Sequence, residues 1–154
     1  MLTMKTKYAL KALAYLAKAP PEQPVLIAEI ATREVIPKKF LELILAELKQ
    51  HGFVKSKKGP RGGYLMAVAA EAIPLAAVIR AVEGPIAPVP CLSRTAYARC
   101  EGCAEEATCG IRLVLADLYE ASVKILESTT VRDLVERTDQ AGRDTAPRQL
   151  RYFI

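Results

Sequence analysis

The chain has 154 residues, of which 51% are hydrophobic and 25% charged, the balance of a globular protein with one packed core. No stretch reaches the roughly 18 continuous apolar residues that a membrane-spanning helix needs. The N-terminal stretch MLTMKTKYALKALAYLAK is interrupted by lysines throughout, which argues against a secretory signal peptide. We therefore expect a cytoplasmic protein, in which structural disulfides are rare.

Positive charge is concentrated in the first 70 residues. They carry 12 Lys and Arg against 5 Asp and Glu, a net charge of +7, whereas residues 71–154 carry 10 against 12, a net charge of −2. A basic half beside a nearly neutral half indicates an anionic partner for the first half only. The alternative is a basic surface that only keeps the protein in solution.

The first 50 residues predict three helices. Apolar residues at helical spacing indicate a helix over residues 5–18, which APPEQP ends because proline cannot continue a helix. VLIAEIATREV predicts a short second helix over residues 25–35. A longer third helix, from Pro37 to Gln50, is predicted by the apolar set Phe40, Leu41, Ile44, Leu45 and Leu48. Two helices joined by a tight turn describe a helix-turn-helix.

The polar face of the third helix has Lys38 and Lys39 at its start and Glu42 one turn later. In a helix-turn-helix, the second helix presents its N-terminal residues to base edges in the major groove. Lysines there can contact phosphates or guanine, and a carboxylate can accept a hydrogen bond from the amino group of cytosine. The same three residues would also suit a solvated helix face.

The next segment, GFVKSKKGPRGGYLMA at residues 52–67, predicts two short strands joined by a glycine-rich turn. It contains Lys55, Lys57, Lys58 and Arg61 and no acidic residue. A basic hairpin directly after a helix-turn-helix is the wing of a winged helix. Arginine at its tip can enter a minor groove, and the lysines can neutralise phosphates. These features favour binding to double-stranded DNA.

Beyond the wing, the sequence predicts a helix over residues 72–84, a proline-rich connection, a long helix from Gly110 and a short terminal helix over residues 129–138. The long helix has a wide, mainly apolar face: Ile111, Leu113, Val114, Leu115, Leu118, Tyr119, Ser122, Val123, Ile125 and Leu126. We expect this face to form a homodimer, since two-fold DNA readers need one. The alternative is packing against the first helix.

All four cysteines lie in CLSRTAYARCEGCAEEATC, residues 91–109, separated by eight, two and five residues. Thiolates are soft, anionic ligands that suit iron–sulfur clusters, usually four per cluster. Four cysteines also suit a tetrahedral zinc site. A third possibility is a metal-free thiol switch in which Arg94 or Arg99 activates Cys100 or Cys103. Inert loop cysteines are the fourth.

The chain resembles the winged-helix transcription regulators that include IscR, NsrR and CymR, the Rrf-two family. The resemblance covers roughly residues 1–135 and rests on MKTKYALKALAYLA, on VIPKKFLELILAELKQHGFVKSKKGPRGGYLMA, and on cysteines ahead of a long helix. In that family a dimer binds promoter DNA, and many members hold an iron–sulfur cluster just before the long helix. By position, the resemblance implies DNA contacts by Lys38, Lys39, Glu42, Lys58 and Arg61.

Family members with a cluster commonly have three cysteines in this loop, with five residues between the last two. Cys103 and Cys109 have this spacing and Cys91 takes the first position, although the first interval is longer here and Cys100 is additional. The only histidine, His51, lies at the end of the third helix. The resemblance therefore implies a 2Fe–2S or 4Fe–4S cluster held by all four cysteines, with zinc as the alternative.

We thus expect a mainly α-helical protein with a small β-hairpin. Residues 1–70 form a winged helix-turn-helix DNA-binding domain, 71–90 a short helix and linker, 91–109 a cysteine-rich metal-binding loop, 110–138 the dimerisation and terminal helices, and 139–154 a mostly disordered tail. The expected function is a homodimeric transcription regulator whose cluster senses redox conditions, nitric oxide or cluster status. An enzyme or electron carrier is disfavoured, because the sequence has no glycine-rich nucleotide loop and no Ser/His/Asp arrangement.

Overall fold

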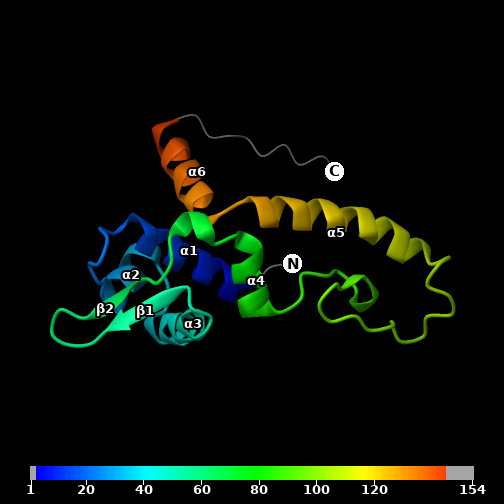
Figure 1. Ribbon diagram of the computed structural model, residues 1–154, viewed down its shortest axis with the longest axis horizontal. Helices are drawn as coiled ribbons and strands as arrows, with labels where there is room; N and C mark the ends of the chain where they lie inside the picture. Colours follow the sequence, from blue (N-terminus) through cyan, green and yellow to red (C-terminus); the bar gives the residue numbers. More distant parts are fainter. Residues whose placement is uncertain (1–2, 145–154) are drawn as a thin grey trace.

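The computed structural model describes residues 3–144 and shows a mainly helical protein with one antiparallel hairpin (Figure 1). This confirms the predicted fold class. Among the helices of the described residues, none is long and apolar enough to cross a membrane. In chain order the elements are α1 (Met4–Lys18), α2 (Ile27–Glu34), α3 (Lys38–Gln50), β1 (Val54–Lys57), β2 (Gly63–Met66), α4 (Leu75–Glu83), α5 (Gly110–Ser128) and α6 (Val131–Arg143).

Helix α1 lies at the centre of the core and packs against α3, α4 and α6. Its N-terminus is capped by Thr3, whose hydroxyl accepts a hydrogen bond from the Lys5 backbone N–H. The inward face is completely buried at Ala9, Ala12 and Leu13. Small alanine side chains allow neighbouring helices to approach closely, so three helices can pack around this one.

Helix α2 begins at Ile27, two residues later than the sequence predicts. The reason is that Val25 pairs with Tyr64 of β2, and each residue donates its N–H to the other's carbonyl oxygen at 2.8 Å. A backbone paired in this way is extended, so it cannot also start a helix. This pairing fastens the base of the hairpin to the helix-turn-helix.

The turn between α2 and α3 depends on two residues. Val35 has the left-handed φ of 55°, which is uncommon for a β-branched residue. The following residue, Ile36, is buried and donates its N–H to the Ala31 carbonyl oxygen at 2.9 Å. Helix α3 then begins at Lys38, so Pro37 occupies the capping position just before the helix and not its first turn. The predicted helix-turn-helix is present.

The hairpin pairs Val54 with Met66 and Lys57 with Gly63 at its two ends. Gly63 has a φ of 149°, and a Cβ atom at this position would lie 2.3 Å from the Val25 carbonyl oxygen. Only glycine therefore permits the close approach that joins the wing to the segment before α2. Phe53, which the sequence places in the first strand, precedes β1 and donates its N–H to the Leu48 carbonyl oxygen at 3.0 Å.

Helices α4 and α6 extend the core of the winged helix, to which α4 contributes Leu75, Val78 and Val82 and α6 contributes Val131. Helix α4 begins later than predicted because the chain after the 3-10 turn at Ala70–Ala72 is extended, and Pro74 pairs with Thr130 in an isolated antiparallel bridge. Two hydrogen bonds join the segment at the start of α4 to the segment at the start of α6. The Leu75 N–H donates to the Thr129 carbonyl oxygen at 2.8 Å, and the Val131 N–H donates to the Ile73 carbonyl oxygen at 2.9 Å.

Helix α6 continues through residues 139–143, where the sequence predicts the start of the tail. It starts at a capping box in which Thr130 and Asp133 exchange hydrogen bonds. Near its end, Asp139 pairs with Lys18 of α1, a contact between distant residues that helical periodicity does not reveal. The predicted tail beyond residue 144 lies outside the described residues.

Helix α5 extends away from the rest of the molecule (Figure 1) and packs on α4 and the Pro90–Leu92 turn. Its inward side is buried at Tyr119 and Val123. Its other side is exposed, with relative exposures of 55–72% at Ile111, Leu113, Val114, Leu118 and Ile125. Packing within the described chain therefore does not account for the wide apolar face.

Candidate nucleic-acid interface and cysteine loop

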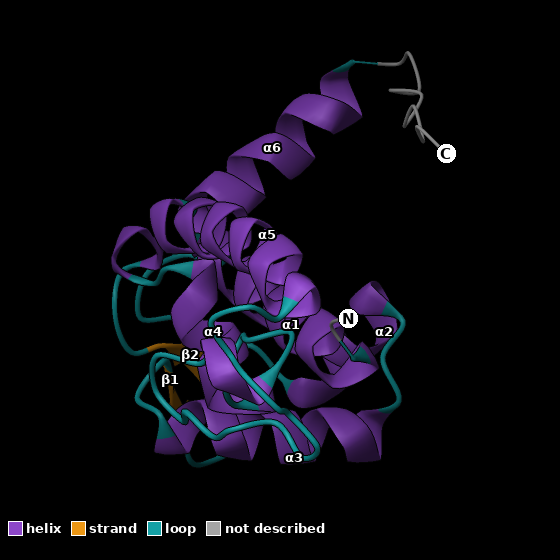
Figure 2. Ribbon diagram, turned by 90° about the vertical axis from the view of Figure 1, so that its right-hand side faces the viewer, coloured by secondary structure: helices purple, strands orange, loops and turns teal. Residues whose placement is uncertain are grey.

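The predicted DNA-contacting side chains lie on two adjacent elements. Helix α3 contacts β1, and both lie on the side of the molecule opposite α6 in two perpendicular views (Figures 1 and 2). All seven predicted residues are exposed: Lys38, Lys39 and Glu42 on α3, and Lys55, Lys57, Lys58 and Arg61 on the hairpin. The structure thus places all seven side chains at the surface of α3 and of the hairpin that α3 contacts, and their contact with DNA stays a prediction.

Two polar contacts of this surface are not apparent from the sequence. Lys49, near the end of α3, donates to the Ser56 hydroxyl of β1 at 2.6 Å and so links the helix to the wing. Lys55 forms an ion pair of 3.3 Å with Glu22 in the loop before α2. This carboxylate offsets part of the positive charge of Lys55.

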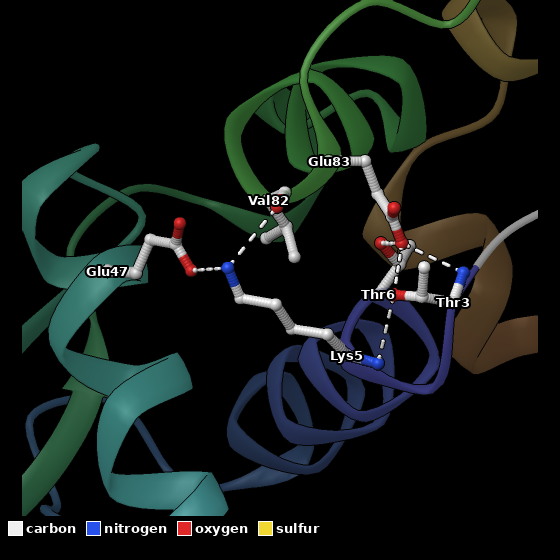
Figure 3. A network of polar contacts seen from close by, with 6 residues as sticks. All are labelled: Thr3, Lys5, Thr6, Glu47, Val82 and Glu83. Atoms are coloured by element: carbon white, nitrogen blue, oxygen red, sulfur yellow. Dashed lines mark hydrogen bonds and ion pairs between the residues drawn. The ribbon is translucent and has the colours of Figure 1, made fainter.

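A polar network joins α1, α3 and α4 (Figure 3), and sequence reasoning missed it. Glu83, the last residue of α4, accepts hydrogen bonds from the Thr3 N–H at 2.8 Å, from the Thr3 hydroxyl, and from the Thr6 hydroxyl at 2.5 Å. The hydrogen bonds from Thr3 and then Thr6 hold the pKa of the Glu83 carboxyl below its usual range. Glu83 thereby fixes the end of α4 against the start of α1.

Lys5 extends this network to α3. Its ammonium group donates to the Val82 carbonyl oxygen of α4 at 3.3 Å and pairs with the Glu47 carboxylate of α3 at 2.7 Å. A single lysine therefore contacts both α3 and α4, the helix that precedes the cysteine loop. The side chains involved are far apart in sequence, so no local motif reveals them.

The cysteine loop begins at Cys91, which lies in the Pro90–Leu92 turn and is 6% exposed. Burial raises the pKa of the Cys91 thiol, and a hydrogen bond with the Cys100 thiol acts in the same direction. Cys100 and Cys103 form a turn in which the Cys103 N–H donates to the Cys100 carbonyl oxygen at 3.2 Å. Cys109 is the N-cap residue of α5, and its carbonyl oxygen accepts a hydrogen bond from the Leu113 N–H at 3.0 Å.

The structure brings together two of the four predicted ligands, Cys91 and Cys100. Within residues 3–144, no three His, Cys, Asp or Glu side chains lie close enough to one another to hold a metal ion. All four cysteines are free thiols. In number and chemical type they fit a thiolate-bound cluster or zinc, and ligation by all four would require the loop to draw Cys103 and Cys109 toward the pair.

Arg112, in the first turn of α5, carries a positive charge, which is opposite in sign to the charge of a thiolate. The positive charge of its guanidinium opposes the rise in the pKa of the Cys91 thiol. Its Nε atom is buried and has no hydrogen-bond partner among the described residues. A buried donor without a partner is costly. An anionic group at the neighbouring thiols would satisfy this donor, which fits a thiolate-bound centre.

Comparison with known proteins decides the family. Residues 2–137 match the Rrf2 family, whose description is iron-dependent transcriptional regulator. The chain belongs to the Rrf2 family. It is 42% identical over 146 residues to an rrf2-like HTH-type transcriptional regulator of Rhodobacter capsulatus, covering 93% of this chain and 97% of the relative. It is 34% identical to the HTH-type transcriptional regulator IscR of Erwinia tasmaniensis, covering 90% of this chain and 80% of the relative.

Among solved structures, the Rrf2-family chain is similar to CymR, the global cysteine regulator of B. subtilis. The TM-score is 0.75 at 32% identity, with 90% of this chain and 98% of CymR covered. This similarity confirms the resemblance and the fold inferred from the sequence. Transcription regulation by a DNA-binding protein of bacterial type is the class of function that this family membership establishes.

For this Rrf2-family chain, we expect Thr6→Val to lower the free energy of unfolding by about 1 kcal/mol at neutral pH. The folded-state pKa of Glu83 is lowered, so its stabilising hydrogen bonds are present above its unfolded-state pKa and are lost as pH falls through the folded-state value. The difference between wild type and variant should therefore shrink in acid, as measured by urea unfolding at a series of pH values.

The matched control is Thr32→Val, because the Thr32 hydroxyl of α2 donates to a backbone carbonyl oxygen, that of Ala28. Its effect on the free energy of unfolding should not depend on the protonation of Glu83. A Thr6→Val effect that stayed constant or grew as pH fell would contradict the role assigned to the Glu83 carboxylate.

Proposed function

We propose that this protein is a homodimeric transcription regulator that binds double-stranded operator DNA and whose affinity for it is set by a centre held at its four cysteines. The observation that carries the proposal is the exposed basic surface formed by the start of α3 and the hairpin. DNA binding, dimerisation and sensing are argued separately below, because each depends on different residues.

DNA binding is supported by the rigidity and charge of the basic surface. The Val25–Tyr64 pairing holds the hairpin at a fixed position relative to the helix-turn-helix. With α3 in the major groove, Lys38 and Lys39 are placed to contact phosphate or guanine, and Glu42 to accept from cytosine. Lys57, Lys58 and Arg61 would contact phosphates and the minor groove beside it.

Dimerisation is supported by the exposed apolar side of α5. Five large apolar side chains on one helix in contact with water are unusual for a stable monomer and typical of an interface. We expect a second copy of the chain to cover this apolar side of α5. A two-fold symmetric dimer formed through α5 would present two copies of α3 to the two halves of a palindromic operator.

An iron–sulfur centre is supported by the thiol set, by the buried Nε atom of Arg112 and by the family description. When bound, such a centre supplies an anionic group whose charge and integrity change with redox conditions or nitric oxide. Cys91, Cys100, Cys103 and Cys109 would hold it, and Arg112 would donate a hydrogen bond to it. Zinc is the alternative occupant of the same four thiols.

A metal-free thiol switch is the second candidate, because the Cys100 thiol contributes to the raised pKa of the Cys91 thiol. In that case the two thiols would form a disulfide and pass two electrons to an oxidant, with release of two protons. The structural relative CymR is the global cysteine regulator of B. subtilis. Both candidates place the signal in residues 91–109.

The coupling between this loop and DNA is proposed to run through α4 and α5. Arg80 of α4 pairs with Glu127 of α5 at 2.7 Å, and Lys5 joins the end of α4 to Glu47 of α3. A change at the loop would shift the end of α4 and, through Lys5, the tilt of α3. Such a signal changes operator affinity only to the extent that the two conformations bind DNA differently.

We expect Lys39→Ala and Arg61→Ala each to weaken binding to the operator several-fold. Each lost phosphate contact should also reduce the slope of log K against log salt concentration by about 0.9. Titration of labelled duplex at several salt concentrations measures both quantities. The control is Arg137→Ala on α6, an exposed arginine on the opposite side of the molecule. Unchanged affinity in both test variants would reject the assigned interface.

We expect Val114→Glu to convert the dimer to a monomer, because a carboxylate would be buried in the apolar interface. Sedimentation equilibrium measures the mass of each form. The control, Thr138→Glu, adds the same charge at an exposed position of α6 and should remain dimeric. A wild-type protein that sediments as a monomer, or a Val114→Glu variant that stays dimeric, would overturn dimerisation through α5.

We expect anaerobically purified or reconstituted protein to be brown and to contain iron and sulfide, and Cys103→Ser to lose most of both. His51→Ala is the control and should retain the cluster. Colourless protein containing zinc would identify the structural alternative, and metal-free protein would favour the thiol switch. Equal operator affinity of cluster-loaded, cluster-free and Cys103→Ser protein would remove the sensing proposal and leave DNA binding intact.

A further inference from the structure

One apolar side chain on the exposed face of α3 has no role in the core. Leu41, Ile44, Leu45 and Leu48 of this helix are completely buried, whereas Leu43 is 67% exposed. An exposed leucine by itself is ordinary on a protein surface. This one lies in the DNA-reading helix, one helical turn beyond Lys39 and next to Glu42.

The neighbours of Leu43 on the helix surface indicate what it contacts. Lys39 precedes it by four residues and Ala46 follows it by three, so these three side chains share one stripe of the helix, and all are exposed. A charged residue on one side and a small alanine on the other do not form the continuous apolar patch that a protein partner would need. The stripe instead suits the major groove, because its positive charge can face a negative phosphate while its apolar side chains face the base edges between the phosphates.

We propose that Leu43 contacts the C5-methyl group of a thymine and thereby helps to determine the operator sequence. This inference rests on the proposed binding of α3 in the major groove. The thymine methyl is the apolar group on the major-groove edges of the four base pairs, and a leucine side chain cannot donate or accept the hydrogen bonds that distinguish the other edges. Contact with this methyl removes apolar surface of both groups from water.

The adjacent residues make this assignment chemically specific. Glu42 can accept a hydrogen bond from a base amino group but offers nothing to a methyl group, while Leu43 has the opposite preference. Lys39, one turn earlier on the same stripe, carries the positive charge that holds this part of the helix against phosphate or guanine. Leu43 thus adds selectivity for thymine on a surface whose remaining contacts are polar.

The experiment replaces thymine by deoxyuridine, which differs by the absence of the C5-methyl group. Duplexes that the full-length protein binds are first selected from a random pool. Each thymine of the selected operator is then replaced singly, and affinities are measured by competition. At one thymine per half-site, we expect the replacement to weaken wild-type binding about fourfold, the effect of one buried methyl-sized group. Replacement at other thymines should have little effect.

The Leu43→Ala variant should bind the thymine and deoxyuridine operators equally at that position. Leu43 is exposed, so the variant should fold, which urea unfolding checks. The control is Leu26→Ala, which removes another exposed leucine, 54% exposed and located just before α2, and should retain the wild-type preference. As a further variant, Leu43→Gln should shift the preference at this position toward adenine, which glutamine binds through two hydrogen bonds.

The outcomes separate this inference from the proposed function. If wild-type protein binds the operator but no deoxyuridine replacement weakens binding, or if Leu43→Ala keeps the wild-type preference, the role of Leu43 is wrong and DNA binding stands. If the wild-type protein selects no duplex from the pool, the proposed function fails, and the inference fails with it.

Discussion

The packing of three helices around the completely buried face of α1 is the constraint on which the rest of the structure depends. Helix α3 carries three of the side chains proposed to contact DNA, α4 precedes the cysteine loop, and α6 packs on α1 as well. Because Ala9 and Ala12 leave little space between these helices, none of them can move independently. A displacement of α4 must therefore be accommodated at α3, and the Thr3–Glu83 and Lys5–Glu47 contacts join the same elements.

The ion pairs show which lysines of the basic first half of the chain are already paired with carboxylates within the fold. Lys5, Lys11 and Lys18 all pair with carboxylates, two of them on neighbouring helices of the helix-turn-helix and one on α6. These lysines contribute to the net charge of the sequence but are engaged within the fold. We therefore expect the attraction for DNA to come mainly from Lys38 and Lys39 at the start of α3 and from Lys57, Lys58 and Arg61 of the wing.

Local signals in the sequence were sufficient for the main elements and insufficient for contacts between distant residues. The stripe from Phe40 to Leu48 predicts α3, and the glycines around Arg61 predict the hairpin, because periodicity and turn chemistry act over a few residues. Val25 looks helical in isolation, and only its pairing with Tyr64 makes it extended. The length of α6 likewise depends on contacts with α1.

The candidate site shows the same division. The charged residues of the DNA surface are recognisable from their order in the chain, whereas the network around Glu83 and the exposure of Leu43 require the packed structure. Cysteine spacing identifies the loop and the type of ligand. It does not fix how the four thiols are arranged, because that arrangement depends on the group they bind.

The close approach of Gly63 to Val25 divides the wing into two parts with different mechanical properties. On one side of this contact, strands β1 and β2 are held by the pairing with Val25 and move with the helix-turn-helix. Beyond it, residues 58–62 form a short projecting tip whose backbone is tied by one hydrogen bond, from the Gly62 N–H to the Gly59 carbonyl oxygen. In the proposed complex with DNA, a stiff base with a compliant tip would allow Arg61 to follow grooves of different width while α3 kept its register on the bases.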